Sequence, residues 1–165
     1  MRLYELDYNN YTQQDITGEV KSKKLSLFDL RIPGERRDPK TPLTRLYFYL
    51  ISRRQFTVYY TTDPATGCVS HTSYVTGPSY KFPFMGKNDI HIGPCHTGPE
   101  FRGKGLYKQV LRSIHKDHIS TKSRAYMLVA EDNIPSIRGI EACGFRHTGS
   151  AEKSSLLKTY RRLPK

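Results

Sequence analysis

Residues 100–107, EFRGKGLY, alternate glycine with positive charge just before a predicted helix. Glycine in the first turn lowers the stability of a helix, so we infer that another group must approach the backbone closely at Gly103 and Gly105. Amide N–H groups at a helix start lie at the positive end of the helix dipole and bind phosphate oxygens. Arg102 and Lys104 add positive charge to the loop. The spacing fits neither GxxxxGK(S/T) nor GxGxxG, so this predicted phosphate site is not that of a P-loop kinase or a dinucleotide-binding fold.

A second segment, residues 133–145, has the signals of a short helix. Asn133 is placed to cap its start, and Pro135 falls in its first turn. Gly144 is placed to end the helix in the left-handed conformation. The two segments are separated by a predicted buried strand, AYMLVAED.

Together these two segments resemble the acetyl-CoA-binding core of the GNAT acyltransferase superfamily. The loop of that family reads Arg/Gln-x-x-Gly-x-Gly/Ala; Arg102 and Gly105 match it, and Tyr107 replaces the final small residue. The second signature of the family is an Asn that leads a helix ending in Gly-Phe. Asn133 and the pair 144–145 match this signature at the right separation from the loop.

The resemblance is closest over residues 89–147. The fold that it implies is an α/β (α+β) domain in which helices flank a central, mixed, twisted sheet of about six to seven strands. The order of the predicted elements agrees, because strands come first and a β–α–β–α–β run follows. A length of 165 residues predicts one domain, residues 1–165.

Local patterns place individual elements within this fold. Four apolar residues recur at the spacing i, i+3, i+4 and i+7 of an amphipathic helix: Tyr107, Val110, Leu111 and Ile114. Alternating or β-rich runs predict an opening strand and a hairpin: residues 2–8, 55–62 and 68–77. Three further segments are predicted less sharply: a helix in residues 15–32, a mobile loop at 33–42, and a helix or strand at 43–53.

The resemblance assigns a donor site for acetyl-CoA. The amides of residues 103–107 would hold the pyrophosphate of coenzyme A, and the backbone of residues 95–97 would pair with the pantetheine arm. Asn133 would lie beside the cofactor where the two central strands part. The predicted cofactor-binding residues are Cys95, His96, Thr97, Arg102, Gly103, Lys104, Gly105, Leu106, Tyr107, Asn133 and Ser136. No metal is expected.

The catalytic groups are less clearly marked. The family often carries a tyrosine seven residues after the Asn, close enough to the sulfur to protonate the leaving thiolate, but this chain has Ile140 there. The leaving thiolate would then be protonated by another residue, for which Tyr107 is the candidate, or by a water molecule. It could also leave without an acid. The amine must be neutral to attack, so a base near the thioester is expected. The candidates are His71, Asp89, His91, His96 and Glu131, of which we take His91 first and His71 second.

Composition limits the partners and the compartment. Lys and Arg number 27 against 15 Asp and Glu, a formal net charge of +12, so a phosphate-bearing partner is expected. The three cysteines are widely spaced, which argues against a disulfide scaffold and a zinc site and fits a reducing compartment. The N-terminal residues lack the apolar core of a signal peptide, and no apolar run is long enough to span a bilayer. We therefore expect a cytoplasmic protein.

The acceptor is expected to be a small primary amine. The segments 92–107 and 136–145 resemble GNAT proteins encoded among bacterial surface-polysaccharide genes, in which the acceptor is an amino group on a nucleotide-linked sugar. Three alternatives stay open: a protein or peptide amine as the acceptor, an acetyl-CoA-binding module without catalysis, and a basic nucleic-acid-binding protein. The last has no recognised nucleic-acid motif in its favour. A homodimer is also compatible with the sequence.

Overall fold

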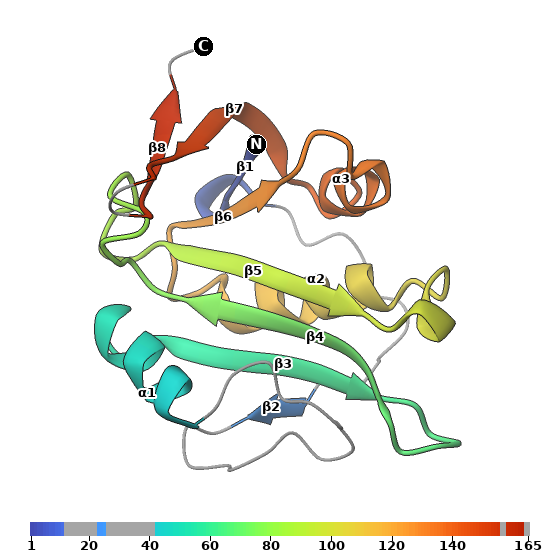
Figure 1. Ribbon diagram of the computed structural model, residues 1–165. Coiled ribbons are helices and arrows are strands. Elements are labelled where there is room, and N and C mark those ends of the chain that lie inside the picture. Colours follow the sequence, from blue (N-terminus) through green and yellow to red (C-terminus); the bar gives the residue numbers. More distant parts are fainter. Residues whose placement is uncertain (12–22, 26–41, 156–157, 164–165) are drawn as a thin grey trace.

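The computed structural model describes residues 1–11, 23–25, 42–155 and 158–163. These residues form a mixed sheet with α1 on one face and with α2 and α3 on the other (Figure 1). The helices are α1 (Pro42–Ile51), α2 (Leu106–His118) and α3 (Ile134–Glu141). The strands are β1 (Arg2–Asp7), β2 (Lys23–Leu25), β3 (Phe56–Thr62), β4 (Val69–Thr76), β5 (Ile90–Thr97), β6 (Arg124–Val129), β7 (Arg146–Lys153) and β8 (Tyr160–Leu163). The predicted α+β class with a mixed sheet flanked by helices is confirmed.

The strand order is β2-β3-β4-β5-β6-β1-β7-β8. The described residues thus give eight strands, where the sequence predicted about six to seven. The strands most easily missed are β2, with three residues, and β8, with four, which are too short for alternation to mark them. Neighbouring strands are antiparallel except β5 and β6, which are parallel.

The parallel pair β5–β6 is held together over a very short length. Only Ile90↔Ala125 and His91↔Tyr126 are paired, although β5 continues to Thr97 and β6 to Val129. A bulge in β5 follows directly, since two residues, Gly93 and Pro94, oppose the single residue between Ser73 and Val75 on β4. Gly93 has φ 148, a conformation that favours glycine. β5 and β6 therefore part at the bulge.

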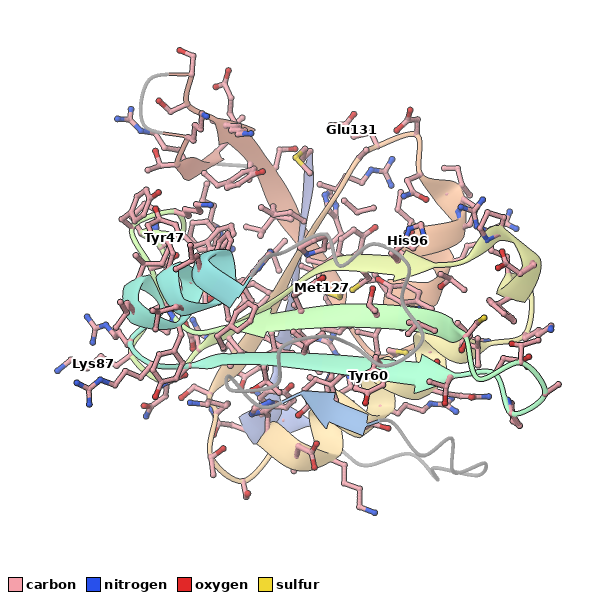
Figure 2. All side chains as sticks on the ribbon, turned by 60° about the horizontal axis from the view of Figure 1, so that its bottom comes forward. Tyr47, Tyr60, Lys87, His96, Met127 and Glu131 are labelled. Carbon is pink, nitrogen blue, oxygen red and sulfur yellow. The ribbon has the colours of Figure 1, made fainter. Side chains whose placement is uncertain are left out.

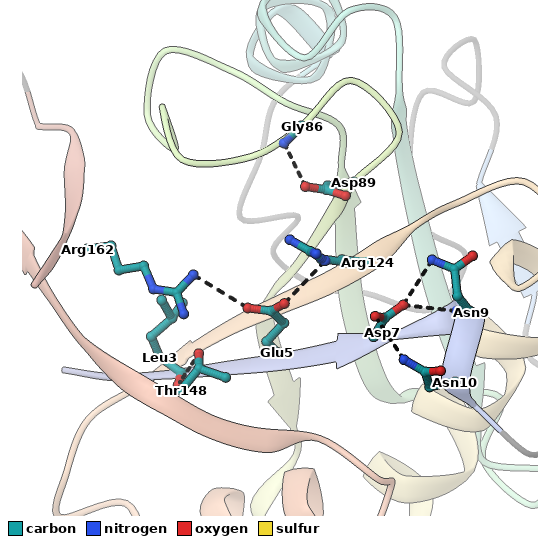
Figure 3. Close-up of polar contacts among 10 residues, drawn as sticks. All are labelled: Leu3, Glu5, Asp7, Asn9, Asn10, Gly86, Asp89, Arg124, Thr148 and Arg162. Carbon is teal, nitrogen blue, oxygen red and sulfur yellow. Dashed lines mark hydrogen bonds and ion pairs between the residues drawn. The ribbon is translucent and has the colours of Figure 1, made fainter. Parts of the chain in front are cut away.

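Strand β1 lies inside the sheet, between β6 and β7. The side chains of Leu3 and Tyr4 are fully buried. Glu5 also ties β1 to its surroundings, because its carboxylate lies 3.3 Å from the Nε of Arg124 on β6 and 3.6 Å from an Nη of Arg162 on β8 (Figure 3). The sequence predicted an opening strand here but not its central place.

The helices follow the predicted patterns. Val110, Leu111 and Ile114 of α2 are fully buried against the sheet, as their spacing indicated. In α3 the side chain of Asn133 caps the start by accepting a hydrogen bond from the Ser136 amide at 3.3 Å, and Gly144 follows the helix with φ 87. None of the described helices has the length and apolarity that crossing a bilayer would require.

The ambiguous segments resolve in part. Residues 42–51 form the helix α1, which settles the choice between helix and strand in this region. Within the segment 15–32, residues 23–25 form the strand β2 rather than a helix. The rest of that segment and the predicted loop, apart from Pro42, lie outside the described residues.

Candidate donor site

A pocket of about 730 Å³ lies beside the last residues of β5, past the point where β5 leaves β6. Its other walls come from the loop before α2, the first turn of α2, and α3. Every residue predicted to bind the cofactor lines it except Lys104, whose Nζ lies over the Phe101 ring at 5.2 Å from the centroid. The lining residues that the motifs did not indicate are Phe101, Lys108, Pro135, Arg138 and Gly139.

The loop at one end of the pocket is built to accept an anion. Gly103 and Gly105 have φ values of 77° and 74°, which glycine adopts without strain. Gly105 is the N-cap of α2, and no side chain caps the helix there. The first amide N–H groups of α2 therefore have no intrahelical or capping partner, and an anion at this end of the dipole satisfies them. Lys108 and Arg138 add two cations to the lining.

The edge of β5 offers a second set of backbone groups. On one side Cys95, His96 and Thr97 pair with β4, in register with Ser73, Thr72 and His71. On the other side the partner β6 has diverged, and no other described residue pairs with this edge of β5. An extended ligand with amide groups can add to such an edge as a strand would.

The sequence profile of the acetyltransferase (GNAT) family matches residues 25–145. This chain belongs to the GNAT acetyltransferase family. A comparison with curated proteins finds no match.

Solved structures share the GNAT fold at low sequence identity. A putative GNAT acetyltransferase from Novosphingobium aromaticivorans superposes with a TM-score of 0.58 at 16% identity, over 88% of this chain and 59% of that one. A GNAT-family acetyltransferase from Colwellia psychrerythraea gives 0.59 at 14%, over 88% and 52%. A phosphinothricin acetyltransferase from Sinorhizobium meliloti, solved with AcCoA, gives 0.54 at 21%, over 76% and 66%. At these identities the likeness establishes the fold, and this chain spans about three-fifths of the Novosphingobium protein.

A buried polar network lies under the pocket of this GNAT chain. His71 is 1% exposed, and its Nδ1 and Nε2 lie 2.7 Å and 2.8 Å from the hydroxyls of Thr97 and Ser73. Ser73 in turn donates to the Cys95 Sγ at 3.2 Å. The Ser73 hydroxyl donates its proton to the sulfur, so its oxygen accepts a hydrogen bond from the Nε2–H of His71. The Nδ1 atom of His71 then accepts a hydrogen bond from the Thr97 hydroxyl.

This network is neutral. Burial, with a smaller contribution from nearby His96, lowers the pKa of His71 to about 4. Burial also raises the pKa of the Cys95 thiol to about 11. A proton transfer from the thiol to the imidazole would therefore be strongly uphill. Both nitrogens of His71 are also occupied, so the network holds β4 and the end of β5 together rather than supplying a base or a nucleophile.

Tyr107 and α3 meet at the pocket in a way that the sequence did not indicate. A Cβ at Gly139 would lie 2.8 Å from Cδ1 of Tyr107, so the ring fills the space left by the missing side chain. Ile140, at the position of the family tyrosine, is 1% exposed and packs in the core without lining the pocket. Burial raises the pKa of Tyr107, with the neighbouring Cys95 adding to the effect. The hydroxyl therefore stays protonated and able to donate.

The remaining candidate bases lie in different places. His91 is 9% exposed, its ring stacks on Phe82 at 4.1 Å between centroids, and it does not line the pocket. Asp89 accepts a hydrogen bond from the Gly86 amide at 2.6 Å (Figure 3), and Glu131 lies 3.7 Å from the N-terminal amine. His96 is exposed and lines the pocket. Among the described residues, no cluster of His, Cys, Asp and Glu is arranged to hold a metal.

We expect the His71 network to make stability depend on pH in a defined window. The pKa of His71 is about 4 in the folded protein, against an ordinary value of 6.5, so between these pH values the unfolded chain binds more protons. The contribution of neutral His71 to the free energy of unfolding is complete above about pH 6.5. It falls as the pH is lowered, by about 2 to 3 kcal/mol near pH 4. Urea unfolding of wild type and His71→Asn across this range measures it.

The variant should be less stable at neutral pH, yet lose less stability than wild type on acidification. His147→Asn is the control, since His147 is exposed, and it should keep the wild-type dependence. An unchanged pH dependence in His71→Asn would show that His71 is not the buried neutral group described here.

Proposed function

We propose that this chain transfers an acetyl group from acetyl-CoA to a primary amine and that the pocket beside β5 holds the donor. The observation that carries this proposal is the parting of β5 and β6 after two residue pairs, next to a helix start that no side chain caps. The first feature leaves a free strand edge for an extended amide-containing arm, and the second leaves amides for a pyrophosphate. Coenzyme A carries both groups in that order.

In this arrangement the amides of residues 103–107 bind the pyrophosphate, with Arg102, Lys108 and Arg138 balancing its charge. The pantetheine arm lies along residues 95–97 of β5 and brings the thioester towards the bulge. A backbone amide there would stabilise the oxyanion that forms when the amine attacks the carbonyl. Asn133 and Ser136 line the far wall, at the start of α3.

The leaving thiolate would meet Tyr107. Its hydroxyl is the one phenol among the residues lining the pocket, and Gly139 leaves room for its ring. A protonated phenol here stabilises the thiolate by hydrogen bonding and can pass it a proton. The hypothesis is tested by the kcat of Tyr107→Phe, which should fall while the affinity for acetyl-CoA is kept.

We place the proton acceptor for the amine at His96, with His91 as the alternative that the sequence favoured. Side chains alternate along β5, so His96 points to the face opposite Cys95 and Thr97. An imidazole can act as a general base, directly or through one water molecule. His91 reaches the amine only if the stack with Phe82 opens.

For the acceptor we propose an amine on a nucleotide-linked sugar. The net charge of +12 exceeds what one coenzyme A would balance, and a second phosphate-bearing substrate would account for the excess. The likeness to proteins of surface-polysaccharide gene clusters points the same way. A protein or peptide amine is the second candidate.

The donor site is tested by adding negative charge to the loop. Acetyl-CoA should raise the Tm of the wild type, because a ligand that binds only the folded state stabilises it. At a concentration one hundred times the Kd, the free energy of unfolding rises by about 2.7 kcal/mol. Gly103→Glu should abolish this shift, because a carboxylate would occupy the phosphate position. Differential scanning fluorimetry with and without acetyl-CoA measures both proteins.

Gly67→Glu is a matched control. Gly67 and Gly103 have φ values of 68° and 77°, and a Cβ at either meets nothing within 4 Å. The two variants therefore carry similar backbone strain, but Gly67 does not line the pocket. A Gly103→Glu protein that still shows the full acetyl-CoA shift would refute the loop assignment.

The acceptor is tested by release of coenzyme A, followed with a thiol-reactive dye. We expect a nucleotide-linked amino sugar to give a higher kcat/KM than the same amino sugar without its nucleotide, and the difference to shrink as salt is added. Faster turnover of peptide amines would instead favour the second candidate. Binding of acetyl-CoA without turnover of any acceptor would favour a module without catalysis.

The base is tested by comparing two histidine variants. His96→Ala should lower kcat/KM by about 100-fold and remove an inflection from its pH profile, whereas His91→Ala should keep the inflection. Steady-state kinetics over a range of pH values measures both. A loss confined to His91→Ala would return the role to His91.

A further inference from the structure

Helix α1 presents a row of large apolar side chains to solvent. Leu43, Leu46, Tyr47 and Leu50 are 79%, 43%, 46% and 60% exposed. Their spacing of i, i+3, i+4 and i+7 puts them on one face of the helix. We call these four residues the α1 stripe. In an ordinary surface helix this is the pattern of the buried face, so its exposure needs a reason.

The helix is already held to the domain by other residues. The Phe48 ring stacks on Phe56 of β3 at 6.0 Å between centroids. The Ser52 hydroxyl donates to the Phe48 carbonyl at 2.6 Å and to the Gln55 carbonyl at 2.9 Å. The stripe is therefore not the face that packs α1 against the sheet.

The exposed apolar residues are concentrated at this place. Tyr80 is 50% exposed and extends the stripe, since its hydroxyl lies 2.9 Å from that of Tyr47. Among the described residues, the large exposed hydrophobics are Met1, Leu43, Leu46, Tyr47, Leu50, Tyr80, Ile134 and Leu163. Five of these eight belong to the stripe or touch it, while the other three are Met1 before β1, Ile134 of α3 and Leu163 of β8.

Positive charge surrounds the stripe. Arg53 and Arg54 follow α1 and are exposed, and residues 42–54 contain no Asp or Glu. Lys81 lies over the Phe48 ring at 4.6 Å from Nζ to centroid. Lys87 is exposed and lies at the same end of the molecule as Tyr47, away from His96 (Figure 2). The surface thus combines an apolar row with a cationic border.

We propose that the α1 stripe and its cationic border dock on an anionic lipid surface. Leucines would enter the boundary between headgroups and acyl chains, tyrosines would lie at the interface, and arginine and lysine would contact the lipid phosphates. Leu43, at 79% exposure, stands out from the surface rather than lining a hollow, and no stripe residue lines the donor pocket. A second copy of the chain would bring the same positive border against itself, which charge disfavours.

The docked orientation leaves the donor pocket accessible. Helix α1 and the loop before α2 lie at opposite ends of β4 and β5 (Figure 1). Docking and acetyl-CoA binding are therefore independent, and the inference stands whether or not the proposed acceptor is correct.

The test is sedimentation of the full chain with vesicles of phosphatidylcholine, with and without phosphatidylglycerol. Wild type should bind only the vesicles with phosphatidylglycerol, and high salt should weaken binding. The double variant Leu43→Ser/Leu50→Ser should lower the partition coefficient by about tenfold or more, because two leucine side chains no longer leave water. Both positions are exposed, so its Tm should stay near that of wild type.

The control is Leu163→Ser, which removes an exposed leucine from β8, and it should bind as wild type does. Equal binding by the double variant and wild type would overturn the proposal, because net charge alone would then explain it. No binding to vesicles with phosphatidylglycerol would also overturn it. Sedimentation velocity tests two alternatives, a dimer and a complex with an added acidic protein. If either forms in wild type, is lost in the double variant, and no lipid binding is seen, the stripe is a protein-binding surface instead.

Discussion

The early separation of β5 from β6 is the constraint around which this structure is arranged. Each strand that leaves a ladder exposes N–H and C=O groups that need partners, and in a folded domain such groups are rarely left unpaired. Here β6 pairs with β1 and β5 pairs with β4, each on the edge that faces away from the gap. Within the described part of the chain, the edge of β5 that faces the gap has no strand partner beyond His91. An extended chain that carries amides can pair with such an edge as a strand would.

Neutral and charged side chains line the same pocket. Burial keeps the His71 imidazole neutral and the Cys95 thiol protonated, and both side chains hydrogen-bond to neighbouring hydroxyls. Lys108 and Arg138 are exposed and supply positive charge to the lining. Ile140 of α3 packs in the core, and the Tyr107 ring of α2 occupies the space beside Gly139.

What the sequence predicts well is what local physics encodes. Gly103 and Gly105 require positive φ, Asn133 caps its own helix, and the period of α2 reports its buried face. These features depend on a few adjacent residues, so the loop, both helices and most of the pocket lining could be inferred. The position of His91 could not, because Phe82, which covers it, comes from a connecting loop without a periodic pattern. The place of β1 was equally hidden, since alternation marks a strand but not its neighbours.

The central place of β1 also bears on how the chain reaches its native state. Arg2 pairs with Val129 and with Ser150, contacts that close loops of well over a hundred residues. Such contacts are entropically costly to form and are associated with slow folding. During synthesis β3, β4 and β5 can assemble as soon as they are made, while β1 must wait for β6 and β7 with its apolar residues exposed. This half of the sheet is thus the last to be completed. Until then the exposed apolar side chains of β1 allow aggregation to compete with folding.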